Sequence, residues 1–147
     1  MDDTAPCRCT CFLLRRAARR TSQVYDRELS AVGLSLNEYS ILRRAGTAQQ
    51  LGALAERLGM DRSTLSRNLK PMQAAGWIEQ RRGDDARQKL VVVSAAGRRL
   101  LKRALPHWER AQARIDALAG NAAIDALHRQ LRQLERALCA DREDAAA

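Results

Sequence analysis

The spacing of the apolar residues constrains the fold of this chain most. The spacing is that of α-helices along most of the sequence, and one segment interrupts it with the spacing of β-strands. Leu51, Leu54, Ala55 and Leu58 stand at i, i+3, i+4 and i+7, which is the spacing of one helical face. Between Trp77 and Ser94, two short runs suited to β-strands flank turn-forming Gly and Asp residues. We therefore expect strands at 77–81 and 89–94 and helices at 11–29, 36–45, 49–58, 62–75, 95–119 and 122–138, with a break at Gly120 and Asn121.

Residues 54–65 fit a helix-turn-helix. This motif needs a small residue where its helices touch, a Gly at the tight turn and an apolar residue facing back from the second helix. Ala55, Gly59 and Leu65 occupy these positions, and Asp61 can cap the second helix. An amphipathic helical hairpin with an ordinary solvated face is the plainer interpretation of the same spacing.

The outer face of the second helix is small, hydroxylic and basic. At about 100° per residue, its inner stripe is formed by Leu65, Leu69 and Met72. The outward residues are Ser63, Ser66, Arg67 and Lys70. Such a face can enter the DNA major groove, where Arg reads guanine and Ser reads several base edges.

The hairpin after this helix carries basic groups that can lie along the minor groove, whose negative potential attracts Arg. These groups are Arg81, Arg82, Arg87 and Lys89. Asp85 is unusual in a phosphate-binding loop, and we interpret it as orienting Arg87 by a charge-assisted hydrogen bond. A charged hairpin that only resists aggregation is the alternative.

Composition agrees with a polyanionic partner. The 147 residues fit one domain and carry a net charge of +9, with 26 Lys and Arg against 17 Asp and Glu. A GC-rich genome, which inflates Arg and Ala, explains part of this balance. Five aromatic residues argue against an RNA-binding sheet or a carbohydrate platform. The chain shows no secretory signal or membrane span, so we expect a cytoplasmic protein with no membrane partner.

The last helix carries a seam that needs a partner helix. Leu127, Leu131, Leu134 and Leu138 alternate at spacings of 4, 3 and 4, as in a coiled coil. The partner can come from the same chain or from a second one. Within the preceding helix, Pro106 should produce a kink or an interruption.

Several of these segments resemble the MarR family. Residues 85–94 followed by Gly97 resemble its wing signature, although Ser94 stands where Thr is usual and Val93 where Leu is usual. Residues 61–67 resemble its recognition helix, and Trp77 with Ile78 resembles the apolar pair before its wing. The resemblance covers residues from about 11 to 139.

The resemblance implies a mainly α fold with a small β-hairpin wing: a winged helix-turn-helix with N- and C-terminal dimerisation helices. It implies a single domain over 1–147, with DNA-binding residues 35–97 and dimerisation helices at 11–32 and 98–139. It also implies a homodimer that represses transcription from a pseudo-palindromic operator in double-stranded DNA. The expected DNA-binding residues are Arg62, Ser63, Thr64, Ser66, Arg67, Lys70, Arg82, Asp85, Arg87 and Lys89.

Two signals for releasing DNA stay open. Cys11, with Tyr25 fourteen residues on, resembles the sensor of the organic-hydroperoxide-sensing branch. The start of a helix favours the thiolate form of Cys11, and Cys7, Cys9 or Cys139 can resolve its sulfenic acid. The bland alternative is that Cys11 is a small residue in the dimer core.

The other signal is a small aromatic or phenolic ligand, because the family has a cleft between its first, second and fifth helices. The candidates by position are Arg15, Arg19, Tyr39, His107 and Trp108. Each of them can equally be an ordinary core or surface residue, and Trp108 suits the core.

The sequence predicts no enzyme. The cysteines lie at no zinc-finger spacing with His107 or His128, so we expect no metal and no cofactor. A thiol peroxidase lacks a helper base in the sequence. An architectural DNA-binding protein with little sequence preference remains the main alternative to a regulator.

Overall fold

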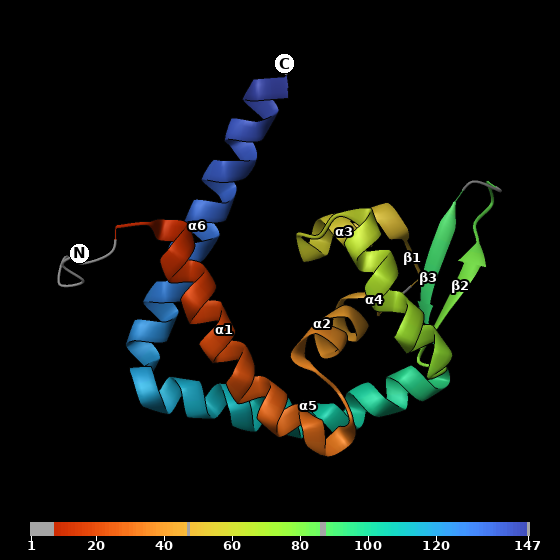
Figure 1. Cartoon of the computed structure of the whole chain (residues 1–147), viewed down its shortest axis with the longest axis horizontal. Helices are drawn as coiled ribbons and strands as arrows, with labels where there is room; N and C mark the ends of the chain where they lie inside the picture. The colour runs from red at the N-terminus through yellow and green to blue at the C-terminus, as the bar shows by residue number, and fades with distance from the viewer. Residues whose placement is uncertain (1–7, 47, 86–87, 147) are drawn as a thin grey trace, which may run out of the picture. The chain divides into compact units, whose positions relative to one another are not determined.

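Helices make up most of this computed structural model, which describes residues 8–46, 48–85 and 88–146 (Figure 1). In chain order the elements are α1 (Thr10–Leu29), the 3-10 helix η1 (Ser30–Val32), α2 (Leu36–Arg44), β1 (Gln49–Gln50), α3 (Leu51–Leu58), α4 (Arg62–Ala74), β2 (Ile78–Arg82), β3 (Lys89–Val93), α5 (Ala95–Ala119) and α6 (Asn121–Ala146). The first compact unit ends at Arg110 and the second begins at Ala111. No helix in these described ranges has the length and apolar character needed to cross a membrane.

The start of α2 is fixed to the end of α1 by local hydrogen bonds. Ser35 and Glu38 form a capping box, in which the Glu38 amide donates to Ser35 Oγ and the Ser35 amide donates to Glu38 Oε2. The Leu36 amide donates to Asp26 Oδ1 of α1 at 2.7 Å. These bonds set the direction in which α2 leaves α1.

The helix-turn-helix of α3 and α4 is confirmed. Ala55 and Leu65 are buried at the contact between the helices. Gly59 ends α3 in the left-handed conformation, with φ 64°, which Gly adopts without steric strain. The Met60 amide then donates to the Ala55 carbonyl at 2.9 Å, which closes the helix end.

The wing belongs to a three-stranded antiparallel sheet in the order β1-β3-β2. Within the hairpin, Ile78 pairs with Val93 and Arg82 pairs with Lys89. The hairpin predicted from the sequence is confirmed as β2 and β3. The sequence does not predict a third strand, and the helix predicted from Gln49 begins at Leu51. Residues 49–50 are extended and pair with β3 instead, because a two-residue strand has too little periodicity to be seen in the sequence.

Ser94 joins the base of the wing to α5. Its hydroxyl donates to the Gly76 carbonyl at 2.6 Å and accepts from the Gly97 amide at 3.0 Å. Its own amide donates to the Trp77 carbonyl. Ser94 therefore provides the capping hydroxyl at a position where the family signature usually has Thr.

Helix α5 is continuous through Pro106, so the predicted interruption is wrong. Proline removes one backbone hydrogen bond, and packing of the flanking residues offsets that loss. Leu100 and Ala104 precede it on the buried side of the helix.

The second unit contains the end of α5 and helix α6, and it presents many apolar side chains to solvent. Leu118 is 75% exposed and Leu131 is 37% exposed. Leu127 and Leu138 are also exposed, whereas Leu134 is half-buried. The predicted leucine seam is thus present on α6 and is largely uncovered in the single chain.

Candidate nucleic-acid interface

The N-terminus of α4 is organised by the carboxylate of its N-cap residue, Asp61. Ser63 Oγ donates to Asp61 Oδ1 at 2.5 Å, and Thr64 Oγ1 donates to Oδ2 at 2.6 Å. The Thr64 amide donates to Oδ1 at 2.8 Å. The hydroxyl of Ser63, then the hydroxyl and amide of Thr64, hold the pKa of the Asp61 carboxyl well below its usual range.

This arrangement decides what the two hydroxyls offer to a ligand. Each hydroxyl has one proton and two lone pairs, and both protons are donated to Asp61. Ser63 and Thr64 therefore present acceptors outward. Acceptors of this kind match the amino groups of cytosine and adenine in the major groove.

The two sides of α4 separate as the sequence predicts. Leu65, Leu69 and Met72 are fully buried, whereas Arg67 and Lys70 are exposed. The other predicted contacts on this helix are Arg62 and Ser63, which are exposed, and Thr64 and Ser66, which are half-buried. Arg67 Nη2 lies 3.4 Å from Thr64 Oγ1, so the guanidinium is held beside the hydroxyl pair.

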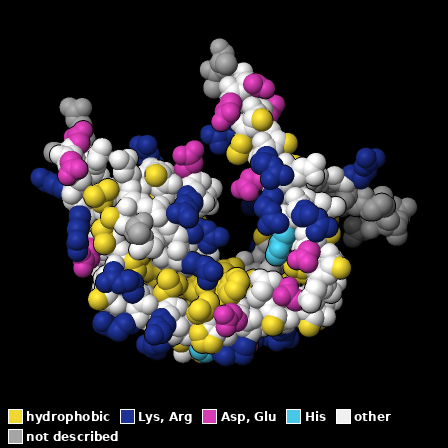
Figure 2. Space-filling model, turned by 180° about the vertical axis from the view of Figure 1, so that it is seen from behind, with side chains coloured by type: hydrophobic (Ala, Val, Ile, Leu, Met, Phe, Trp, Pro, Cys, Tyr) yellow, Lys and Arg dark blue, Asp and Glu magenta, His cyan; other side chains and the backbone are white. Residues whose placement is uncertain are grey.

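The wing presents Arg82, Asp85 and Lys89 to solvent. Arg81 forms an exposed ion pair with Glu79 at 2.7 Å. The Asp85 carbonyl accepts from the Gln88 amide at 2.8 Å, which closes the turn. Arg87 lies outside the described residues, so its orientation by Asp85 stays a prediction. Basic side chains are prominent over the surface around this region (Figure 2).

Removal of the Asp61 carboxylate should weaken α4 in a pH-dependent way. The folded pKa lies below the value of about 3.9 for an unfolded Asp, so the stabilisation is present above that pH and is lost as the pH falls toward the folded pKa. We expect Asp61→Ala to lower the midpoint of thermal unfolding at pH 7. The difference from the wild type should shrink below about pH 4. Asp84→Ala, in the exposed wing turn, is the control, and an equal effect there would contradict the capping role.

A second cluster lies between α1, α2 and α5, where three aromatic rings stack. Trp108 lies between Tyr25 and Tyr39, with ring centroids 6.1 and 6.2 Å apart. The Arg43 guanidinium lies 5.2 Å from the Trp108 ring and donates to Tyr39 Oη at 2.8 Å. Trp108 is half-buried, so the expectation of a core position holds only in part.

A cavity of about 350 Å³ adjoins this cluster between α2 and α5. Tyr39, Leu101 and Leu105 give it an apolar wall. Arg43, Arg98 and Lys102 line it with positive charge. The combination suits a small ligand with an apolar body and an anionic end.

The other predicted ligand residues do not line this cavity. Arg15 and Arg19 are exposed on α1, and His107 is half-buried with Nδ1 2.6 Å from Arg110 Nη2. Sequence reasoning missed Arg43, Arg98 and Lys102. Their signal was the spacing of four residues from Tyr39 to Arg43 and from Arg98 to Lys102, which puts each pair on one helical face.

The cysteines lie apart from this cavity. Cys9, Cys11 and Cys139 are exposed thiols, and Cys7 lies outside the described residues. Cys9 is the N-cap of α1, and its sulfur accepts from the Phe12 amide at 3.4 Å. Fourteen residues of helix separate Cys11 from Tyr25 by about 21 Å, so a contact between them requires a second chain. Among the described residues, no three His, Cys, Asp or Glu side chains are placed to hold a metal.

Comparison with known proteins agrees with the geometry of the helix-turn-helix and wing. The sequence profile of the MarR family matches residues 32–88. The M. tuberculosis transcriptional regulator MosR, solved in complex with DNA, is 36% identical with a TM-score of 0.82, and the match covers 91% of this chain and 98% of that one.

Two further matches are more distant. The uncharacterized HTH-type transcriptional regulator YwoH of Bacillus subtilis is 27% identical over 86 residues. That match covers 55% of this chain and 61% of YwoH, which is less than two thirds of the relative. CouR from Rhodococcus jostii, solved with p-coumaroyl-CoA, is 21% identical with a TM-score of 0.72, over 84% of this chain and 88% of that one. The similarity to CouR shows a shared fold only.

Proposed function

The chain belongs to the MarR family of DNA-binding transcriptional regulators, and we propose that it acts as a homodimeric repressor of a pseudo-palindromic operator. In this proposal residues 35–97 bind DNA, and the helices at 11–32 and 98–139 form the dimer within one domain. The observation that carries it is the outward face of α4, where Arg67 lies beside a hydroxyl pair held by Asp61 and the exposed Lys70 follows further along the helix.

The proposed DNA contacts divide into two groups by the groove they reach. Those from α4 lie at the major groove, where the outward-facing side chains read base edges. Those from the wing lie along the minor groove and respond to its shape and charge. The two groups are Arg62, Ser63, Thr64, Ser66, Arg67 and Lys70 from the helix, and Arg82, Asp85, Arg87 and Lys89 from the wing.

The proposal is tested by comparing operator and unrelated duplexes at one fixed salt concentration. A sequence-specific regulator should bind its operator about 10³-fold or more tightly than unrelated DNA. The operator for this test is selected by the protein from a random-sequence pool. Equal affinity for both duplexes would contradict the proposal and favour an architectural DNA-binding protein.

Arg67→Ala should relax base preference. A bidentate Arg–guanine contact contributes about 1–3 kcal/mol of discrimination, so operator binding should fall by that amount while unrelated DNA is bound almost as before. Arg87→Ala is the matched comparison, because a minor-groove contact should weaken binding to both duplexes evenly. Two variants that both bind the operator as tightly as the wild type would contradict this docking.

Two signals are proposed for release from DNA. One is a small aromatic or phenolic anion in the cavity between α2 and α5, supported by Arg43, Arg98 and Lys102 at its wall. The other is oxidation of Cys11, in which peroxide converts the thiolate to sulfenic acid and is itself reduced to water or an alcohol. The exposed Cys11 thiol supports this second route.

Cys11→Ser separates the two signals. If Cys11 is the sensor, low peroxide should release the wild type from DNA, a reductant should restore binding, and Cys11→Ser should bind but ignore peroxide. Cys9→Ser is the matched control and should still respond. If peroxide releases Cys11→Ser from DNA as readily as it releases the wild type, Cys11 is not the sensor. That result would favour a ligand bound in the cavity between α2 and α5 as the signal.

A further inference from the structure

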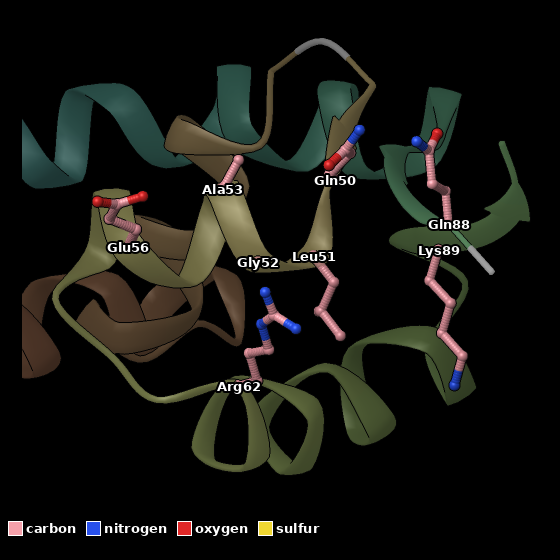
Figure 3. A pocket seen from close by; sticks show the side chains of 8 residues that line it. All are labelled: Gln50, Leu51, Gly52, Ala53, Glu56, Arg62, Gln88 and Lys89. Carbon is pink, nitrogen blue, oxygen red and sulfur yellow. The ribbon is translucent and has the colours of Figure 1, made fainter. Parts of the chain in front are cut away.

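A cavity of about 520 Å³ lies between the start of α3, the start of α4 and strand β3 of the wing (Figure 3). Two cationic side chains reach it from different elements: Arg62 from α4 and Lys89 from β3. Neither makes an ion pair within the described part of the chain. Two cationic side chains therefore line one hollow, and neither has an ion-pair partner among the described residues.

Arg62 does not point off the outer face of α4. Its guanidinium extends toward α3 and lies against Gly52 (Figure 3). A Cβ atom at Gly52 would lie 2.8 Å from Arg62 Nη2 and 3.0 Å from Nε, so the bare backbone of Gly52 makes room for the guanidinium. Gly52 thus sets the position of the charge in the cavity.

The backbone at the start of α3 adds to the positive potential. Leu51, Gly52 and Ala53 line the cavity, and their amides belong to the first turn of the helix. The N-cap residue, Gln50, makes no side-chain hydrogen bond to this turn. A helix N-terminus whose amides lack a capping side chain favours an anion, and here the Arg62 guanidinium lies beside it at Gly52.

We propose that this cavity, which we call the phosphate seat, holds a backbone phosphate of the bound duplex. The proposal rests on the proposed function, in which α4 enters the major groove and the wing follows the minor groove. The sugar–phosphate strand that separates the two grooves must then pass between these elements, where the seat lies. Its volume admits a phosphate together with adjoining sugar.

Arg62 and Lys89 therefore differ from the other proposed DNA contacts of α4 and the wing, because they bind the strand between the grooves and do not read bases. Glu56 lines the same cavity, and its carboxylate opposes an anion there. The seat therefore contains a built-in repulsion that limits affinity for DNA of any sequence. Glu56→Gln should strengthen binding to operator and unrelated duplexes alike.

Gly52→Ala provides the sharpest test, because it acts on the guanidinium without removing a charge. The added methyl group must displace the flexible end of Arg62, and Ala is favoured over Gly within a helix. We expect a folded protein whose thermal midpoint is no lower than that of the wild type. Its affinity for both duplexes should fall about tenfold per half-site, as expected for loss of one charge-assisted contact.

Arg62→Ala should produce the same loss, and the double variant should bind no more weakly than Arg62→Ala alone. The slope of log affinity against log salt should become shallower by about 1 for each half-site. In a duplex with one neutral methylphosphonate at the seat, located by scanning each half-site, the wild type should lose affinity and Arg62→Ala should not. Arg57→Ala, from an exposed position on α3 outside the cavity, is the charge-matched control and should show no coupling to the methylphosphonate.

The outcomes separate the seat from the proposed function. If Gly52→Ala binds like the wild type, or if Arg62→Ala weakens only operator binding, the seat is wrong. If the wild type shows no preference for an operator, the proposed function fails. The seat is then still tested on unrelated DNA, where the loss in Gly52→Ala and its coupling to Arg62 are expected.

Discussion

Leu131→Asp should abolish the dimer and, with it, operator binding. Leu131 is exposed in the single chain and stands in the middle of the seam with Leu127, Leu134 and Leu138. Each subunit of the dimer would then have to bury one carboxylate in the interface without a partner. Light scattering should therefore give the mass of a monomer, or circular dichroism should show an unfolded chain.

The consequence for DNA binding is large, because one subunit alone reaches a single half-site. Loss of the second site removes an effective-concentration gain of about 10²–10⁴-fold. Gln133→Asp introduces the same charge at an exposed position outside the seam and should leave the dimer intact. A wild type that is a fully folded monomer at micromolar concentration would contradict the dimer.

Gly97→Ala should be among the most destabilising single substitutions in the DNA-binding region. A Cβ atom at this position would collide with the Trp77 carbonyl oxygen and lie 2.8 Å from Val93 Cγ1. The Trp77 carbonyl is fixed by its hydrogen bond from the Ser94 amide, so the backbone cannot yield easily. Overpacking against such a rigid neighbour costs about 1–3 kcal/mol, and we expect the upper end of that range.

Gly46→Ala is the matched control for this substitution. The atom closest to an added Cβ there is the Arg43 carbonyl oxygen at 3.8 Å, an ordinary contact. Denaturant unfolding should place Gly46→Ala within about 0.5 kcal/mol of the wild type. Similar stabilities for both variants would show that the wing and α5 do not need a close approach at Gly97.

Local signals were sufficient to predict the recognition helix. Ala55, Gly59 and Leu65 each satisfy a requirement of the helix-turn-helix that is visible in the sequence, namely size, backbone conformation and helical spacing. The separation of Arg67 from the buried stripe also follows from periodicity alone. These features depend on neighbours within about ten residues along the chain, which is the range that pattern reasoning covers.

Features formed by distant segments were missed. Strand β1 exists because Gln49 pairs with Val91, and nothing within its two residues indicates that partner. A local rule predicts that Pro106 interrupts its helix, but α5 continues through Pro106 because its flanking residues are packed. The direction of Arg62 is set by the bare backbone of Gly52 on another helix, so the sequence identifies Arg62 as a basic residue of α4 without showing its role.

The most direct test of the central claim is a hydroxyl-radical footprint of the protein on an operator selected from random-sequence DNA. Two recognition helices related by a two-fold axis should protect two half-sites about one helical turn apart, with dyad symmetry. The selected sequences should correspondingly form an imperfect palindrome. A footprint without dyad symmetry, or uniform protection along any duplex, would contradict a dimeric sequence-specific regulator.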